Sequence, residues 1–165
     1  AIGHFMEEAR KRPWFADTVF VFVADHTHRG RGRQDLPIEN YHIPFVVYAP
    51  RHFAPAQVAA VASQIDVGPT LLGLLGFGYH SKFFGADVLH DGPGHARALL
   101  ANYQTVGLYQ DGMVVELKPN RRWRIVDAAT GEDRPLDALG EHLLAEAVSY
   151  YQVASEAYLS GALKE

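Results

Sequence analysis

The first half of the chain begins with an amphipathic segment and continues with an apolar one. In 2–9, apolar residues recur at spacings of three and four with charged residues between them, which predicts a helix. The helix should end before Pro13, because a residue that precedes proline is pushed out of helical geometry. The run 18–24 is β-branched or aromatic almost throughout. It predicts a strand that is apolar on both faces, as in the middle of a helix-covered parallel sheet.

Further elements of the same kind follow up to about residue 92. The segment 42–49 predicts a second buried strand, and 57–64 has the small-residue composition of a helix. Asp66 is predicted to be the N-cap of another helix, which Gly76 should end. Strands that alternate with helices predict an α/β fold for 1–92.

The pattern changes in 93–165, where shorter polar and apolar runs alternate around turn signals. The pair Asp111-Gly112 is a strong signal for a two-residue β-hairpin turn. The predicted elements are a short helix at 95–102, strands at 104–109, 113–118 and 122–126, and a long amphipathic helix at 138–159. The second part is therefore expected to be a small antiparallel sheet with a terminal helix.

Composition and charge narrow the function classes. The chain has 165 residues, 48% hydrophobic and 21% charged, which is an ordinary globular balance. Its net charge of -4 gives no bulk attraction to nucleic acid or anionic lipid. The absence of cysteine excludes disulfides, thiolate nucleophiles and zinc-thiolate sites. No apolar run approaches the roughly 20 residues that span a bilayer. The nine histidines make a metal site or phosphate chemistry worth seeking.

The most distinctive candidate for chemistry is the pair Asp25-His26, which follows the first predicted strand. In open α/β sheets, ligands bind beyond the carboxyl ends of strands. A carboxylate beside an imidazole can bind a divalent ion that accepts oxygen and nitrogen. Two ligands do not complete a site, so the others must come from elsewhere. The alternative is that Asp25 caps a turn and His26 is an ordinary loop residue.

Four blocks in order resemble the sulfatase and lipoteichoic acid synthase (phosphoglycerol transferase) family of the alkaline phosphatase superfamily. The first block is the stretch Trp14–Thr27, which resembles the strand that carries the family's late metal ligands. The other three are Tyr41–Pro50, Ser63–Gly76 and Phe84–Leu89. Together they cover about the first half of the chain, and the part from Asn102 onward resembles the family's closing sheet and helix less specifically.

The resemblance implies a fold and a metal centre. The expected fold is the C-terminal part of an alkaline-phosphatase-like mixed sheet with flanking helices, spanning 1–92, followed by the small sheet and helix of 93–165. Asp25 and His26 match the family's late metal ligands, so one divalent ion (Mn, Mg or Zn) is expected in the complete protein. The remaining ligands and the Thr or Ser nucleophile lie upstream in the family. We therefore expect a C-terminal portion that binds metal weakly and is inactive alone.

Several other residues have the chemistry of a nucleophile or of a substrate contact. Thr18, Thr27 and Ser63 do not stand in the family's nucleophile motif, so no catalytic residue is assigned in this chain. Substrate contact is predicted for His28, Arg29 and His42, and Arg31 and Arg33 share the basic loop, because arginine binds oxyanions bidentately. The alternatives are a solvated basic loop and a structural histidine.

The function expected from the resemblance is metal-dependent hydrolysis or transfer of sulfate or phosphate esters, with lipid- or glycan-linked substrates. Among catalytic functions, the alternatives are a phosphodiesterase and a phosphoethanolamine transferase. The alternative from another class of function is a domain that keeps the fold but has only an interaction or structural role. The resemblance also places the parent protein in a bacterial inner membrane, anchored by a region absent here, with this part facing the periplasm or exterior. No nucleic-acid partner is expected, and exposed strand edges should make the chain self-associate.

Overall fold

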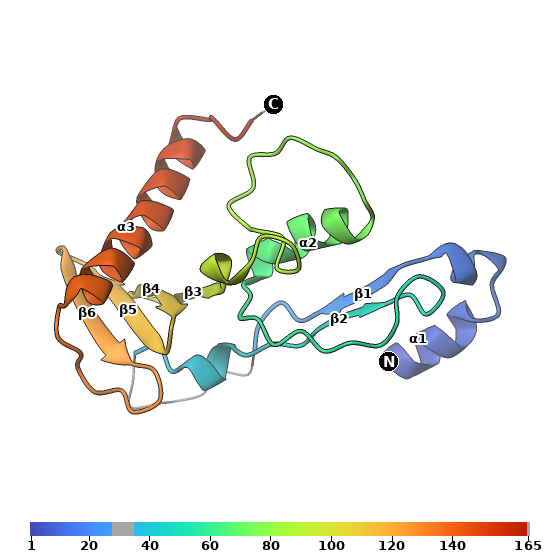
Figure 1. Ribbon diagram of the computed structural model, residues 1–165, viewed down its shortest axis with the longest axis horizontal. Helices are drawn as coiled ribbons and strands as arrows, with labels where there is room; N and C mark the ends of the chain where they lie inside the picture. Colours follow the sequence, from blue (N-terminus) through green and yellow to red (C-terminus); the bar gives the residue numbers. More distant parts are fainter. Residues whose placement is uncertain (28–34, 165) are drawn as a thin grey trace. The chain divides into compact units, whose positions relative to one another are not determined.

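The computed structural model describes residues 1–27 and 35–164, which form two compact units (Figure 1). The first unit comprises Ala1–Arg29 and Tyr41–Val58, and the second comprises Gly30–Asn40 and Ala59–Glu165. The candidate metal residues and His42 therefore belong to the first unit. The predicted division into 1–92 and 93–165 rests on sequence pattern and stays a prediction.

The first unit packs a helix on a two-stranded sheet. Its elements are α1 (Ile2–Ala9), the 3-10 helix η1 (Pro13–Asp17), β1 (Phe20–Val23) and β2 (Phe45–Tyr48). Met6 and Ala9 of α1 are buried against Phe20, and aromatic side chains of η1, β1 and β2 complete this core. The predicted N-terminal helix is confirmed, and it ends before Pro13 as expected.

The arrangement of β1 and β2 differs from the expectation of buried parallel strands. The two strands pair antiparallel, with Phe20 opposite Tyr48 and Val23 opposite Phe45. Phe20 belongs to the core, whereas Val23 and Val46 are 41% and 51% exposed. An apolar run specifies a strand but not the direction of its partner, so the sequence could not distinguish the two pairings.

The first unit leads to a prediction about association. A two-stranded sheet is marginally stable by itself, and its edges can pair with another chain. We expect the isolated chain to self-associate at high protein concentration, because β1 and β2 have only each other as strand partners in the described structure. Light scattering should show a mass that rises with concentration, and a monomer throughout the range would contradict the prediction.

The second unit contains a four-stranded sheet and most of the helices. The helices are η2 (Ile38–Tyr41), whose last residue belongs to the first unit, η3 (Gln64–Asp66), α2 (Val67–Leu74), η4 (Pro93–His95) and α3 (Ala138–Leu159). The strands are β3 (Arg97–Ala101), β4 (Val106–Gln110), β5 (Met113–Lys118) and β6 (Arg122–Asp127). They form an antiparallel sheet in the order β3-β4-β5-β6.

The predicted hairpin and terminal helix are confirmed. Asp111 and Gly112 connect β4 to β5 with φ values of 50° and 75°, as a primed two-residue turn requires. Helix α3 spans the predicted residues and packs on one face of the sheet (Figure 1). Their shared core consists of Leu108, Met113, Val115, Ile125, Leu143 and Ala147. The fold is the expected mixed α/β arrangement that ends in an antiparallel sheet and a helix.

Two helix predictions are wrong. Within 95–102, residues Arg97–Ala101 form β3 instead, because pairing with β4 and the burial of Arg97 outweigh the helix propensity of the alanines and leucines. The segment 57–63 forms no helix, and only η3 begins at Gln64. Its small side chains are mostly exposed and bury no apolar face, and helices depend on such packing for most of their stability.

Among the described residues, no helix has the length and apolar character needed to cross a membrane.

Candidate metal centre

The candidate metal residues follow the carboxyl end of β1. The antiparallel contact continues one step past the strand, where the Ala24 amide donates to the Pro44 carbonyl at 3.3 Å. The chain then bends at Asp25, whose Oδ1 accepts a hydrogen bond of 2.9 Å from the backbone amide of His26. This bond fixes one carboxylate oxygen and leaves the other, Oδ2, on the side of the histidine ring.

The imidazole of His26 is oriented by its neighbour. Its Nδ1 lies 2.9 Å from the Thr27 carbonyl oxygen, and a carbonyl only accepts, so Nδ1 carries the proton of the neutral ring. The lone pair is therefore on Nε2, which lies 3.5 Å from Asp25 Oδ2. Both side chains are highly exposed, at 80% for His26 and 88% for Asp25. If Nε2 bound a metal ion, the Thr27 carbonyl would accept the N–H on the other side of the ring, as metal-binding histidines require.

The donor pair fits a divalent cation. Two donors that each lie about 2.0–2.2 Å from one ion can be no more than about 4.4 Å apart, and the pair at 3.5 Å meets this limit. A carboxylate oxygen and a neutral imidazole nitrogen suit zinc and manganese, and the oxygen also suits magnesium. Within 1–27 and 35–164, no group of three or more His, Cys, Asp or Glu side chains could hold a metal ion. The pair would therefore be only part of a ligand set.

His42 lies at the same end of the β1–β2 ladder. Since Ala24 contacts Pro44, the chain just before Pro44 runs beside the chain just after Ala24. His42 is exposed and stands two residues before Pro44. The structure thus gives it a place from which it could contact a ligand of the Asp25-His26 pair. The predicted substrate residues His28 and Arg29 lie outside the described residues, as do Arg31 and Arg33.

The comparisons with known proteins agree with this architecture. Residues 1–77 match the family model described as Sulfatase, and this segment contains Asp25, His26 and His42. A structure of a protein in the alkaline phosphatase superfamily from Vibrio parahaemolyticus aligns with 97% of this chain at a TM-score of 0.79 and 26% identity. The chain is thus similar to sulfatases over residues 1–77, and its fold is similar to that of a protein in the alkaline phosphatase superfamily.

Two further structures share the fold. Ps i-CgsB aligns with 93% of the sulfatase-like chain at a TM-score of 0.60 and 17% identity. Its complex with k-i-k-neocarrahexaose aligns at 0.59 and 18% over the same share. The chain spans about 40% of the length of each of these solved proteins.

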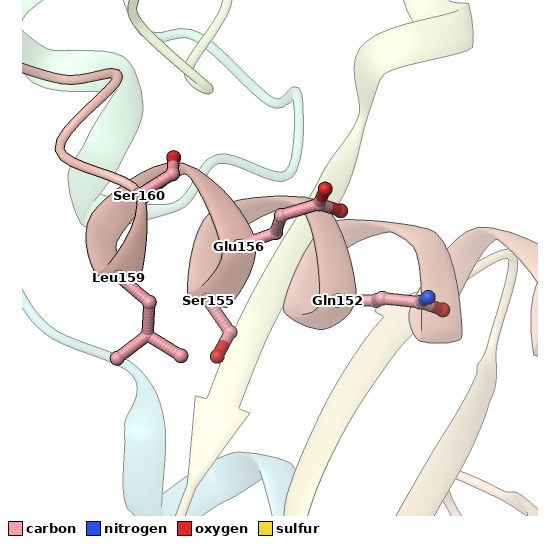
Figure 2. A pocket seen from close by; sticks show the side chains of 5 residues that line it. All are labelled: Gln152, Ser155, Glu156, Leu159 and Ser160. Carbon is pink, nitrogen blue, oxygen red and sulfur yellow. The ribbon is translucent and has the colours of Figure 1, made fainter.

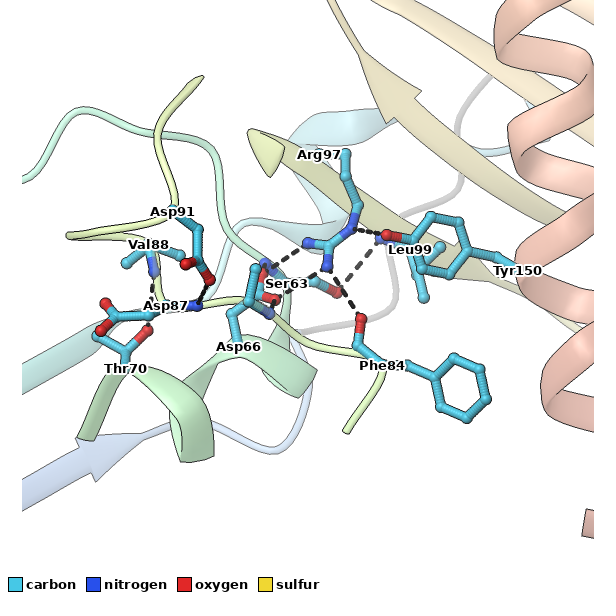
Figure 3. Close-up of polar contacts among 11 residues, drawn as sticks. Ser63, Asp66, Thr70, Phe84, Asp87, Val88, Asp91, Arg97, Leu99 and Tyr150 are labelled. Atoms are coloured by element: carbon cyan, nitrogen blue, oxygen red, sulfur yellow. Dashed lines mark hydrogen bonds and ion pairs between the residues drawn. The ribbon is translucent and has the colours of Figure 1, made fainter. Parts of the chain in front are cut away.

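A buried ion pair in the second unit of the sulfatase-like chain was missed by sequence reasoning. Asp66 and Arg97 form a bidentate pair with N···O distances of 2.8 and 3.0 Å (Figure 3). The carboxylate also accepts from the backbone amides of Ser63 at 2.7 Å and Ala86 at 2.8 Å. The predicted helix is confirmed as α2 with Asp66 at its N-cap position, but the Asp66 side chain makes no cap hydrogen bond to that helix. It instead closes a capping box with Ser63 across η3, and the Ser-x-x-Asp spacing was the available signal.

The surroundings of Arg97 explain how its charge is kept inside the protein. Burial alone would lower the pKa of Arg97, but the hydrogen bonds to Asp66 and Tyr150 outweigh it and raise the pKa. The Tyr150 hydroxyl lies 3.0 Å from Nε, and the Phe84 carbonyl lies 3.3 Å from a terminal nitrogen. The side chains of the ion pair are 1–2% exposed, so the pair connects η3, β3 and α3 rather than binding a ligand.

A second acid–imidazole pair provides a contrast to Asp25-His26. His90 Nδ1 lies 2.7 Å from Asp87 Oδ2, and Asp87 Oδ1 accepts from the Leu89 amide at 3.0 Å. A direct hydrogen bond of 2.7 Å leaves no room for an ion between the two groups. Adding a Cβ at Gly73 would place it only 1.8 Å from Asp87 Oδ2, so the pair is also closely packed. We regard it as structural.

A hollow of about 520 Å³ lies along the outside of α3 (Figure 2). It is lined by Gln152, Ser155, Glu156, Leu159 and Ser160. None of these residues was predicted to bind metal or substrate, and one carboxylate among them does not make a metal site. The hollow therefore stays outside the candidate centre.

Proposed function

We propose that this chain supplies two ligands of the metal centre of a hydrolase or transferase that acts on sulfate or phosphate esters. The observation that carries the proposal is the pairing of Asp25 Oδ2 with His26 Nε2 at 3.5 Å, exposed at the end of β1. The sulfatase-family match over 1–77 supports the reaction class. The proposal includes a sulfate or phosphate ester as substrate, water or an alcohol as acceptor, and Mn, Mg or Zn as the metal.

The roles of the chain's own groups follow from their geometry. Asp25 would supply a charged oxygen, and His26 would supply a neutral nitrogen whose tautomer is set by Thr27. A divalent ion bound there would lower the pKa of a hydroxyl nucleophile and neutralise charge on the ester oxygens. In the proposed mechanism a Thr or Ser outside this chain attacks the sulfur or phosphorus, and the alcohol of the ester leaves with a proton. Water or an acceptor alcohol then attacks the enzyme ester and releases the Thr or Ser hydroxyl. His42 would contact the ester from the same end of the ladder.

The test is an assay of the complete gene product with sulfate esters and with phosphate mono- and diesters. We expect turnover of at least one class, loss of turnover in EDTA, and recovery with manganese, magnesium or zinc. The 165-residue chain assayed in parallel should be inactive, because the proposed nucleophile is not in it. A complete protein that cleaves none of these esters with any of the metals would support the alternative of a non-catalytic interaction domain.

The proposed placement at a bacterial inner membrane rests on the family resemblance. It predicts that the complete protein fractionates with membranes and that this part is accessible to protease from the periplasmic side. Recovery of the complete protein in the soluble fraction of the cytoplasm would overturn this part of the proposal.

A further inference from the structure

A hollow with an unusual set of side chains lies at the outer edge of β6, which the segment 132–134 partly covers through an antiparallel bridge between Val126 and Asp133. Its volume is about 410 Å³, and β6 is the last strand of the four-stranded sheet. We call it the β6 hollow, and it is lined by Lys118, Arg122, Trp123, Arg124, Ile125, Asp133 and Arg134. Four cationic side chains and one tryptophan thus face one space that holds a single carboxylate.

Two of these cations are already neutralised within the second unit. Lys118 contacts the carboxylate of Asp35 and lies 3.1 Å from an oxygen of Glu116. Arg124 donates from Nε to Asp133 at 2.5 Å and from a terminal nitrogen to the Gly131 carbonyl at 3.2 Å. The charges of Lys118 and Arg124 are therefore offset by neighbouring carboxylates.

The other two cations are not neutralised by neighbours. Arg122 donates from Nε to the Pro119 carbonyl at 3.3 Å, which is an uncharged acceptor. Among the described residues, neither Arg122 nor Arg134 has a carboxylate within 4.0 Å, and both side chains are exposed. The pKa of Asp127 is lowered chiefly by hydrogen bonds from the backbone amides of Thr130 and Ala129, and Arg134 adds a smaller longer-range attraction. The hollow therefore presents two guanidinium groups that can bind oxyanions bidentately.

Trp123 adds an aromatic surface beside these charges. It is 45% exposed and stands opposite Leu117 in the β5–β6 register, so its backbone is held by the sheet. An exposed tryptophan that lines a hollow offers a large, rigid apolar face for a flat ligand. Together with the two free guanidinium groups, it favours a ligand that has rings with apolar faces and separate anionic substituents.

We propose that the β6 hollow binds an anionic oligosaccharide, with a sugar ring against Trp123 and its sulfate, phosphate or carboxylate groups on Arg122 and Arg134. A nucleic acid fits less well, since its phosphates are closely spaced and the chain offers two free cations here at a net charge of -4. The proposal does not involve Asp25 or His26 and goes beyond the proposed reaction. It assigns a separate carbohydrate-binding role to the second unit.

The experiment is a fluorescence titration in EDTA, which removes any contribution from metal. The chain has two tryptophans, so a Trp14→Phe background leaves Trp123 as the reporter. The probes are a dextran sulfate oligosaccharide, unsulfated dextran of the same length, and a single-stranded oligonucleotide of the same charge. We expect saturable binding of dextran sulfate, at least tenfold weaker binding of the other two, and weakening with salt.

Paired variants show whether dextran sulfate binds at the β6 hollow or to any exposed arginines of the chain. Arg122→Gln/Arg134→Gln should weaken dextran sulfate binding at least tenfold. Arg10→Gln/Arg12→Gln removes the same charge from exposed positions of the first unit. This control should change the affinity for dextran sulfate less than twofold. Trp123→Ala, followed by calorimetry, should weaken binding at least fivefold. Equal effects of the two arginine pairs, equal binding of the oligonucleotide, or no binding of dextran sulfate would overturn the proposal. Circular dichroism confirms that each variant is folded.

Discussion

Arg97→Met should lower the free energy of unfolding of the second unit by about 3–5 kcal/mol, because it leaves the Asp66 charge buried without its partner. The Asp66 side chain is 2% exposed and would lose two hydrogen bonds from the guanidinium. Urea denaturation followed by Trp123 fluorescence in the Trp14→Phe background measures the change, since Trp123 belongs to this unit.

Two comparisons show whether the loss comes from the buried charge. Arg124→Met breaks an ion pair of 2.5 Å with Asp133 in the same unit, whose side chains are 38% and 74% exposed, so it should cost less than about 1 kcal/mol. The double variant Asp66→Asn/Arg97→Met should recover part of the loss, because it buries no charge while the amide oxygen still accepts a hydrogen bond. A loss in Arg97→Met no larger than that in Arg124→Met would show that the buried pair does not stabilise the unit.

Asp25→Ala and His26→Ala should each reduce the metal-dependent turnover of the complete protein by about a thousandfold or more. Loss of one metal ligand removes several kcal/mol of charge stabilisation, and each 1.36 kcal/mol is a factor of ten in rate. Steady-state kinetics across a range of metal concentrations measures the effect. Part of the activity should return at high metal concentration, which a purely structural defect would not produce.

The second acid–imidazole pair supplies the matched control for this prediction. His90→Gln removes an exposed imidazole beside a carboxylate, as His26→Ala does, but outside the proposed centre. It should leave turnover within about twofold of the unsubstituted protein. Equal losses in the His26 and His90 variants, or full activity after Asp25→Ala, would contradict the assignment of the metal ligands.

His42→Ala should affect the same reaction differently. Its predicted role is contact with the ester, so the KM for the ester should rise about tenfold while the metal concentration needed for half-maximal activity stays unchanged. A changed metal requirement would instead make His42 a ligand of the ion. An unchanged KM would mean that this exposed histidine has no part in substrate binding.

The sequence predicted correctly those elements whose conformation depends on residues close together in the chain. The Asp111-Gly112 turn determines the β4–β5 hairpin by its own backbone requirement, and α3 has an amphipathic pattern long enough to be unambiguous. The prediction of a helix at 95–102 was wrong because its alanines and leucines favour a helix. The conformation of β3 depends instead on a distant contact, since Arg97 binds a carboxylate 31 positions away. The expectation of a parallel sheet was wrong for β1 and β2 for a similar reason. The direction of their pairing depends on how two segments far apart in the sequence meet.

The candidate centre was accessible to sequence reasoning only in part. Asp25 and His26 could be selected because they directly follow a recognisable strand, and they are exposed beside one another in the structure. The Thr27 carbonyl that sets the tautomer of His26 could not be predicted, because the hydrogen bond depends on the bend at Asp25. The contribution of His42 depends on the register of β2 against β1, which only the structure provides.

Whether Asp25 and His26 hold an ion together is tested most directly by NMR of the histidine rings during a titration of the chain with Mn²⁺. We predict that the paramagnetic ion broadens the ring signals of His26 at low occupancy, well before those of His90, with weak affinity because the ligand set is incomplete. Asp25→Asn should abolish this selectivity. Equal broadening of both histidines, or selective broadening of His26 that survives Asp25→Asn, would contradict a cation shared by these two side chains.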